Sequence, residues 1–261
     1  MKLWRAGVLL LFAFALVFSG TAESGAKQTK ALQIEEFFNG DEGTMVLTNL
    51  KNNHTYVYNE KRSTRNLTPE STFKVANALI GLQTNAVRDE YEVKRWDRVV
   101  REFETWNRDH TLASAMRESA IWFYQDMARD IGETEMQGYV GEMGYGNQDI
   151  SGGIDSFWLN STLKISALDQ LQFMKKLVNE TLPFDEKHQK TVKRTMIQDE
   201  QDSYTLHGKT GTRLSDAGLG WYIGYVETKK DTWVFAVNIN GSGSEAKNIA
   251  LKALKKQLII K

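Results

Sequence analysis

Strand-like patterns lie near both ends of this chain, and a long helical pattern separates them. Residues 44–50 and 55–59 indicate one hairpin, and residues 219–226 and 233–238 indicate a second. Residues 244–258 carry apolar side chains at helical spacing. We therefore expect an α+β fold: an antiparallel sheet formed from both termini, flanked by N- and C-terminal helices, with an inserted helical lobe.

The composition is that of a globular protein. The chain has 261 residues, of which 41% are hydrophobic and 25% charged, enough to bury a sizeable core in one compact unit. From Thr72 to about Gln198 the pattern is mostly helical, with short loops at glycines. The formal net charge is zero, so we expect no nucleic-acid partner.

The N-terminus has the three parts of a secretory signal. Residues 1–5 are basic, residues 6–18 are almost purely apolar, and small residues follow. We predict a signal peptide over residues 1–22, cleaved after Ala22 or Ala26, and a domain over residues 35–260. The protein is then exported, secreted or held on the outer side of the cell, with no membrane contact after signal removal. An uncleaved anchor is the alternative, although the apolar segment is short for a span.

Cysteine is absent, which excludes disulfides, a thiol nucleophile and thiolate metal sites. The four histidines are scattered without ligand spacing, so a metal hydrolase is disfavoured. Counting alone leaves a Ser-His-Asp triad open, but no histidine sits in a recognisable frame.

Ser71-Thr72-Phe73-Lys74 is the main candidate for nucleophilic chemistry. Thr68 and Pro69 suit a helix start, which places Ser71 in the first turn with a free backbone N–H. Lys74 follows on the same face among apolar neighbours, and burial lowers the pKa of such an amine. A neutral lysine can act as a base. A capped surface serine beside an ordinary lysine is the alternative.

Three further motifs follow in order: Ser119-Ala120-Ile121, Tyr145-Gly146-Asn147 and Lys209-Thr210-Gly211. Alone, they are compatible with a helix-start serine, a turn and a basic loop before a strand. On an edge strand, however, the last triplet offers a cation, a hydroxyl and an open backbone to a carboxylate and an amide carbonyl.

Together these motifs resemble the class D (oxacillinase-type) serine β-lactamases. The sequence as a whole looks most similar to enzymes of Gram-positive bacilli. Phe157-Trp158-Leu159 and residues 220–225 also look like that family, over roughly residues 35–260. The resemblance implies the penicillin-recognising serine enzyme fold and hydrolysis of the β-lactam amide bond of penicillin-type antibiotics. It implies a β-lactam substrate, no metal, and carbon dioxide or bicarbonate to carbamylate Lys74. Some family members pair, so either a monomer or a homodimer is expected.

The resemblance also implies roles for single residues. Ser71 is the nucleophile, carbamylated Lys74 the general base, Trp158 the donor to the carbamate, and Ser119 the proton relay to the lactam nitrogen. The substrate-binding residues implied are Lys209 and Thr210 for the carboxylate, Gly211 for an open backbone, Thr212 with Ser71 for the oxyanion hole, Ile121 and Leu159 for an apolar wall, Tyr145 and Asn147 for the cleft, and Lys247 for the carboxylate.

Three positions depart from the family's pattern. Ile121 replaces the usual valine, Thr212 a bulkier aromatic residue, and Lys247 an arginine that often clamps the substrate carboxylate. A lysine is a point charge and not a two-pronged fork, so weaker anchoring is expected. Two alternatives stay open: a penicillin-binding or β-lactam-sensing protein that acylates without efficient deacylation, and a DD-peptidase, which the features around Trp158 disfavour.

Overall fold

The structure is a computed structural model, and it describes residues 29–261. The predicted signal peptide, residues 1–22, lies outside the described residues. Nine strands occur in this part of the chain: β1 (Thr29–Ala31), β2 (Gly43–Asn49), β3 (Thr55–Tyr58), β4 (Val93–Lys94), β5 (His110–Thr111), β6 (Ile197–Gln201), β7 (Tyr204–Thr212), β8 (Gly220–Thr228) and β9 (Thr232–Ile239). The helices over the same residues are α1 (Glu60–Ser63), α2 (Lys74–Gln83), α3 (Leu112–Glu118), α4 (Ile121–Ile131), α5 (Glu133–Met143), α6 (Ala167–Val178), α7 (Glu186–Thr195) and α8 (Gly243–Lys256), with 3₁₀ turns η1 (Glu35–Phe38), η2 (Glu70–Phe73) and η3 (Glu104–Trp106).

Seven strands form one sheet in the order β1-β3-β2-β9-β8-β7-β6. Both predicted hairpins are confirmed, as β2–β3 and β8–β9, and Met45 to Val237 is one register pair where the two ends of the chain meet. The pairing in this sheet is antiparallel, as predicted, except at one edge, where the short strand β1 pairs with β3 in parallel. The prediction of an α+β fold, with one sheet formed by segments from both ends of the chain, is confirmed.

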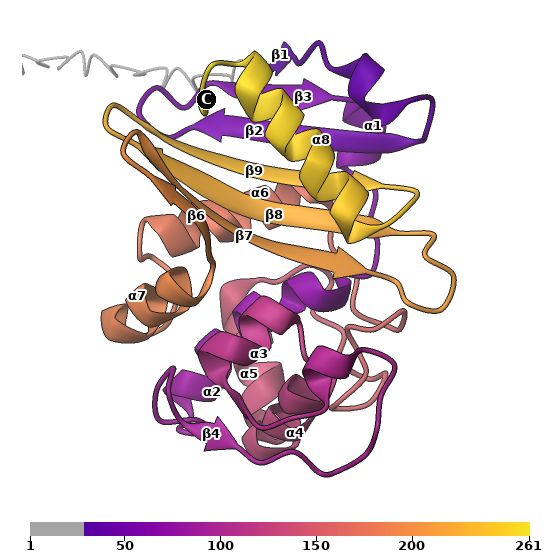
Figure 1. The fold of residues 1–261 in the computed structure, drawn as a ribbon, viewed down its shortest axis with the longest axis vertical. Helices are drawn as coiled ribbons and strands as arrows, with labels where there is room; N and C mark the ends of the chain where they lie inside the picture. Colours follow the sequence, from indigo (N-terminus) through magenta and orange to yellow (C-terminus); the bar gives the residue numbers. More distant parts are fainter. Residues whose placement is uncertain (1–28) are drawn as a thin grey trace, which may run out of the picture.

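Alternation along β8 and β9 divides the core into two layers. Val234 and Ala236 face the cluster shared with the helical lobe, whereas Phe235 and Val237 face the cluster beneath α8. Figure 1 shows α8 lying across one face of the sheet, with α6 behind the other. The predicted C-terminal helix over 244–258 is therefore confirmed, and its apolar side covers the sheet.

The helical lobe lies below the sheet and is built from α2 to α5 (Figure 1). Every residue of α2 from Lys74 to Leu82 is buried, including the polar side chains of Lys74 and Asn77. The expectation that residues 72–198 are mostly helical was only partly right, because residues 84–110 and 144–166 contain long loops.

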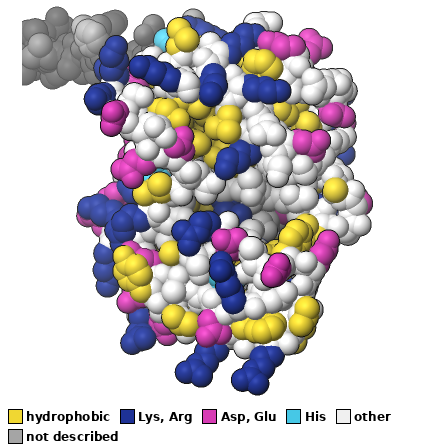
Figure 2. All heavy atoms as spheres, in the orientation of Figure 1, with side chains coloured by type: hydrophobic (Ala, Val, Ile, Leu, Met, Phe, Trp, Pro, Cys, Tyr) yellow, Lys and Arg dark blue, Asp and Glu magenta, His cyan; other side chains and the backbone are white. Residues whose placement is uncertain are grey.

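The outer surface carries both signs of charge. Figure 2 shows acidic and basic side chains interspersed over one face of the molecule. Within residues 29–261, no helix is long and apolar enough to cross a membrane.

Candidate active site

Ser71 lies in η2, where the chain enters α2 between the sheet and the helical lobe. Lys74 begins α2, and its Nζ donates to Ser71 Oγ at 2.6 Å. The two side chains meet because residues three apart share a helix face. The structure therefore places the candidate nucleophile and the candidate base in direct contact.

Lys74 is completely buried. Burial lowers the pKa of its amine well below the usual range, the positive charge of Lys209 lowers it further, and the carboxylate of Glu70 opposes the shift. Charge is expensive in so apolar a site, so the neutral amine is the favoured form. Its Nζ also lies 5.6 Å from the centre of the Tyr124 ring.

A second serine–lysine pair faces the first. Ser119 ends α3 in a left-handed conformation, with φ of 58°. Lys209, on β7, donates from Nζ to Ser119 Oγ at 3.0 Å and to the Thr210 carbonyl at 2.9 Å. Burial, then the charge of Lys247, lowers the pKa of Lys209 to about 7. This amine can therefore gain or lose a proton near neutral pH.

The part of β7 nearest the site has an open outer edge. β7 is not an edge strand, since β6 follows it in the sheet, but the pairing with β6 stops at His207. Gly211 lies beyond that point and approaches η2 closely: a Cβ added there would be 3.2 Å from the Ser71 nitrogen. The missing side chain lets the strand backbone lie beside the backbone N–H of the nucleophile.

A pocket of about 320 Å³ opens over these groups. Among the predicted residues, those that line it are Ser71, Ser119, Ile121, Thr210, Gly211 and Thr212. Thr212 Oγ1 also accepts a hydrogen bond of 2.9 Å from the Gly243 N–H at the start of α8. The pocket therefore lies between η2, the C-terminal end of α3 and the C-terminal end of β7.

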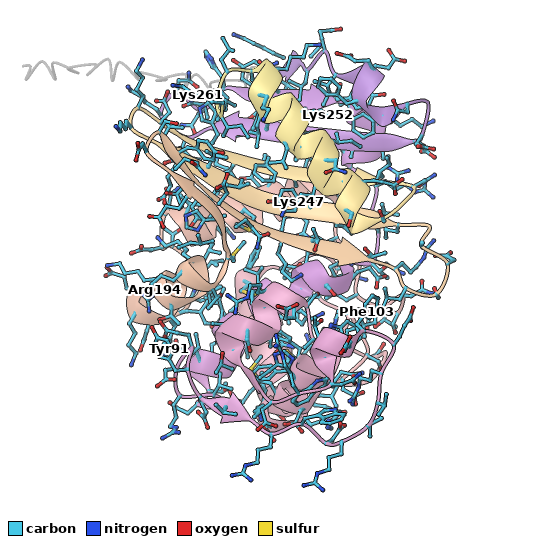
Figure 3. All side chains as sticks on the ribbon, in the orientation of Figure 1. Tyr91, Phe103, Arg194, Lys247, Lys252 and Lys261 are labelled. Atoms are coloured by element: carbon cyan, nitrogen blue, oxygen red, sulfur yellow. The ribbon has the colours of Figure 1, made fainter. Side chains whose placement is uncertain are left out.

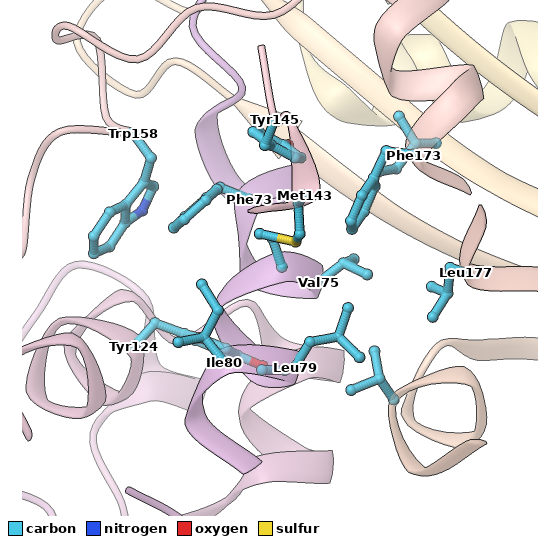
Figure 4. Close-up of a cluster of buried hydrophobic side chains, with 14 of the residues drawn as sticks. Phe73, Val75, Leu79, Ile80, Tyr124, Met143, Tyr145, Trp158, Phe173 and Leu177 are labelled. Carbon is cyan, nitrogen blue, oxygen red and sulfur yellow. The ribbon is translucent and has the colours of Figure 1, made fainter. Parts of the chain in front are cut away.

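Trp158 lies in the same buried hydrophobic cluster as Phe73 (Figure 4). Its ring is fully buried and stacks on Phe73 with centroids 5.5 Å apart, yet the indole Nε1 has no hydrogen-bond partner. A buried donor without a partner is uncommon, because leaving it unpaired costs free energy. Leu159 is partly buried against the same cluster.

Tyr145 and Asn147 do not line the pocket. Tyr145 is buried, and its hydroxyl donates to Gln170 Oε1 at 3.3 Å. Asn147 braces a loop, because its amide donates to the Thr162 carbonyl at 3.0 Å and accepts from the Lys164 N–H at 2.8 Å. The structure places both in the scaffold behind the site.

Lys247 also lies outside the pocket lining. In Figure 3 it is on α8 over the sheet, whereas Phe103 is on a loop of the helical lobe. Lys247 Nζ donates to Gln198 Oε1 at 3.0 Å and lies 5.9 Å from the centre of the Tyr222 ring. Its charge still influences the site by lowering the pKa of Lys209.

Several lining residues had no signal in the sequence pattern. Phe103, Trp106 and Leu214 give the pocket an apolar rim, and Arg117 adds a cation. They come from loops and a helix end, where no periodicity predicts the direction of a side chain. No group of three or more His, Asp or Glu side chains that could hold a metal occurs in residues 29–261.

Comparisons with known proteins agree with this geometry. The penicillin binding protein transpeptidase domain matches residues 39–259. The chain is 53% identical to a probable β-lactamase, YbxI of Bacillus subtilis, over 265 residues, covering 100% of this chain and 99% of the relative. A crystal structure of a class D β-lactamase from Bacillus subtilis superposes with a TM-score of 0.86 at 58% identity, over 87% of this chain and 96% of that one.

A receptor domain is similar as well. The C-terminal domain of the Bacillus licheniformis BlaR penicillin receptor has a TM-score of 0.85 at 35% identity, covering 89% of this chain and 98% of that one. The fold is thus that of the penicillin-recognising transpeptidases. By identity over its whole length, the chain belongs to the class D β-lactamase family.

Proposed function

We propose that this protein hydrolyses the β-lactam amide bond of penicillin-type antibiotics through an acyl-ester on Ser71, and so contributes to antibiotic resistance. The observation that supports this most directly is the contact of 2.6 Å between Ser71 Oγ and Nζ of Lys74, whose burial lowers the pKa of its amine. A serine is a weak nucleophile at its own pKa and needs such a base in contact.

The base is carbamylated Lys74. A carbamate forms on a neutral amine only, and burial favours that form here. It requires a hydrogen-bond donor in an otherwise apolar site, and the unpartnered Trp158 Nε1 offers one. When present, the carbamate supplies a carboxylate-type base to the Ser71 hydroxyl and to the deacylating water.

The other residues bind and orient the substrate. The backbone N–H groups of Ser71 and Thr212 form the oxyanion hole for the developing charge. Ser119, hydrogen-bonded to Lys209, passes a proton to the leaving lactam nitrogen. Lys209 and Thr210 hold the substrate carboxylate, whose negative charge raises the pKa of Lys209 and keeps it protonated.

The departures from the family's pattern affect the surroundings of the reacting groups and not the reaction itself. Ile121 and Leu159 form the apolar wall, and the extra methylene of Ile121 narrows the space for water. Lys247, bound to Gln198, acts on the substrate carboxylate through its charge and not through a two-pronged contact. Tyr145 and Asn147 support the cleft from behind.

The predicted signal peptide makes this an exported enzyme, secreted or on the cell-surface side. The mature domain covers residues 35–260 and works without a metal, without nucleic acid and without a membrane, as a monomer or homodimer. Its requirement is carbon dioxide or bicarbonate.

A second candidate is a slow-turnover penicillin-binding or β-lactam-sensing protein, which the likeness to the BlaR receptor domain favours. Deacylation separates the two. We would mix the protein with benzylpenicillin and follow the intact mass with time. A rapid return to the free mass is expected of a hydrolase, whereas a lasting adduct would indicate a sensor. Ser71→Ala must remove the adduct; an adduct retained by that variant would exclude Ser71 as the nucleophile.

A further inference from the structure

Glu70, the residue directly before the nucleophile, has two unfavourable features. Its backbone is left-handed, with φ of 51°, and its side chain is only 2% exposed. A left-handed conformation at a residue other than glycine is costly, and so is a buried carboxyl group. Both persist only where the surroundings compensate them.

The compensation comes from the segment that contains Trp158. The Glu70 N–H donates to the Trp158 carbonyl at 3.1 Å, and Glu70 Oε1 accepts from the Asn160 N–H at 3.0 Å. The Thr68 hydroxyl donates to the same oxygen at 2.6 Å. Asn160 is also left-handed, with φ of 46°. One hydrogen bond thus joins the two left-handed residues, Glu70 and Asn160, and a second joins Glu70 to Trp158.

These bonds flank Leu159: one is made by the Trp158 carbonyl before it and the other by the Asn160 N–H after it. The Trp158 ring stacks on Phe73, whose next neighbour is Lys74 (Figure 4). The position of the indole Nε1 therefore depends on where the backbone of 158–160 is held. Phe73 supports one face of the ring, and Glu70 supports the backbone.

We propose that Glu70 is a positioning residue: its peptide N–H and carboxylate clamp residues 158–160 to the start of the nucleophile helix and so aim the Trp158 indole at the Lys74 site. The clamp itself stands on geometry alone. Its consequence for carbamylation rests on the proposed function.

The first experiment measures the clamp without reference to activity. Glu70→Gly removes the carboxylate and suits the left-handed backbone, so the variant loses the hydrogen bond without added strain. Glu70→Gln keeps a carbonyl oxygen for the Asn160 N–H. Amide hydrogen exchange of a peptide covering residues 158–163 should accelerate about tenfold or more in Glu70→Gly, the loss expected for one bond to a charged acceptor, and much less in Glu70→Gln. Equal amide exchange rates in the wild type and Glu70→Gly would show that Glu70 does not hold this segment.

The second experiment measures the consequence. The bicarbonate concentration that gives half-maximal hydrolysis should rise about tenfold in Glu70→Gly and return towards the wild-type value in Glu70→Gln. Glu90→Ala is the matched control: it removes another buried carboxylate, one paired with Arg194 away from the pocket. It should lower stability and leave the bicarbonate requirement unchanged.

The two experiments fail in different ways. If Glu70→Gly has a lower melting temperature but the wild-type bicarbonate requirement, Glu70 is a structural residue only and the proposal is wrong. If the wild-type enzyme itself ignores bicarbonate, the carbamate part of the proposed function fails, while hydrogen exchange still decides for or against the clamp.

Discussion

Gly211→Ala tests whether the close approach of β7 to the nucleophile is needed for catalysis. The added Cβ would lie 3.1 Å from the Pro69 carbonyl oxygen and 3.2 Å from the nitrogens of Ser71 and Thr72. Comfortable contacts of a carbon atom are about 3.5 Å or longer. All three neighbours are backbone atoms, so relief requires the strand and η2 to separate by a few tenths of an ångström.

That separation displaces the proposed oxyanion hole, whose two backbone N–H groups, of Ser71 and Thr212, lie on either side of the contact. Removing one oxyanion donor costs about 10²–10³-fold in rate. We expect kcat/KM of Gly211→Ala for a chromogenic β-lactam to fall about 10²-fold. The free energy of unfolding should fall by only about 1–3 kcal/mol, as for other overpacked sites.

Gly138→Ala is the matched control. Gly138 lies within α5, and a Cβ there would meet no atom within 4 Å. Its activity should be unchanged and its stability raised by about 0.5–1 kcal/mol. If Gly211→Ala keeps kcat/KM within about threefold of the wild type, the close strand–helix contact does not shape the oxyanion hole and this reasoning is wrong.

Three further predictions concern single side chains. Lys74→Ala should lose hydrolysis and acylate about 10²–10⁴-fold more slowly in stopped-flow measurements, because its general base is gone; full turnover would defeat the assigned role. Trp158→Phe keeps the ring but removes the indole N–H, so its bicarbonate requirement should rise about tenfold in steady-state assays; an unchanged requirement would leave Trp158 a packing residue. The folded pKa of Lys209 is about 7 and the unfolded value is near that of a free lysine, so between these values the unfolded chain binds more protons. Relative to Lys209→Met, the unfolding free energy of the wild type in urea should therefore rise with pH above about 7, by up to about 1.4 kcal/mol per pH unit; a flat or falling difference would contradict the lowered pKa.

Periodic patterns in the sequence predicted the regular elements of the fold. Alternation along 219–226 and 233–238 is a strand signal, and it corresponds to β8 and β9. The loops between residues 84 and 110 were missed because side chains hold them: Asp109 accepts from the Trp96 N–H, and Asn107 accepts from the Arg101 N–H. Such hydrogen bonds leave no periodic signal in the sequence.

In the site, too, some positions follow from local geometry and others from distant contacts. Ser71 and Lys74 meet through helix geometry, which spacing predicts. The predicted helix start was wrong in detail, since Thr68 donates to Glu70 and caps no backbone N–H, and the left-handed backbone of Glu70 is held by residues 158–160. The direction of the Lys247 side chain on α8 is likewise set by Gln198 on β6. Residues distant in the sequence therefore determine the backbone of Glu70 and the direction of Lys247, and the local sequence does not reveal these contacts.

Hydrolysis by this protein is proposed to depend on a carbamylated Lys74. Its most direct test is turnover of a chromogenic β-lactam by the mature protein, freed of carbon dioxide and then supplied with bicarbonate. We expect weak turnover without bicarbonate and rapid, saturable turnover with it. A single stoichiometric burst in both conditions, or rapid turnover that ignores bicarbonate, would contradict it.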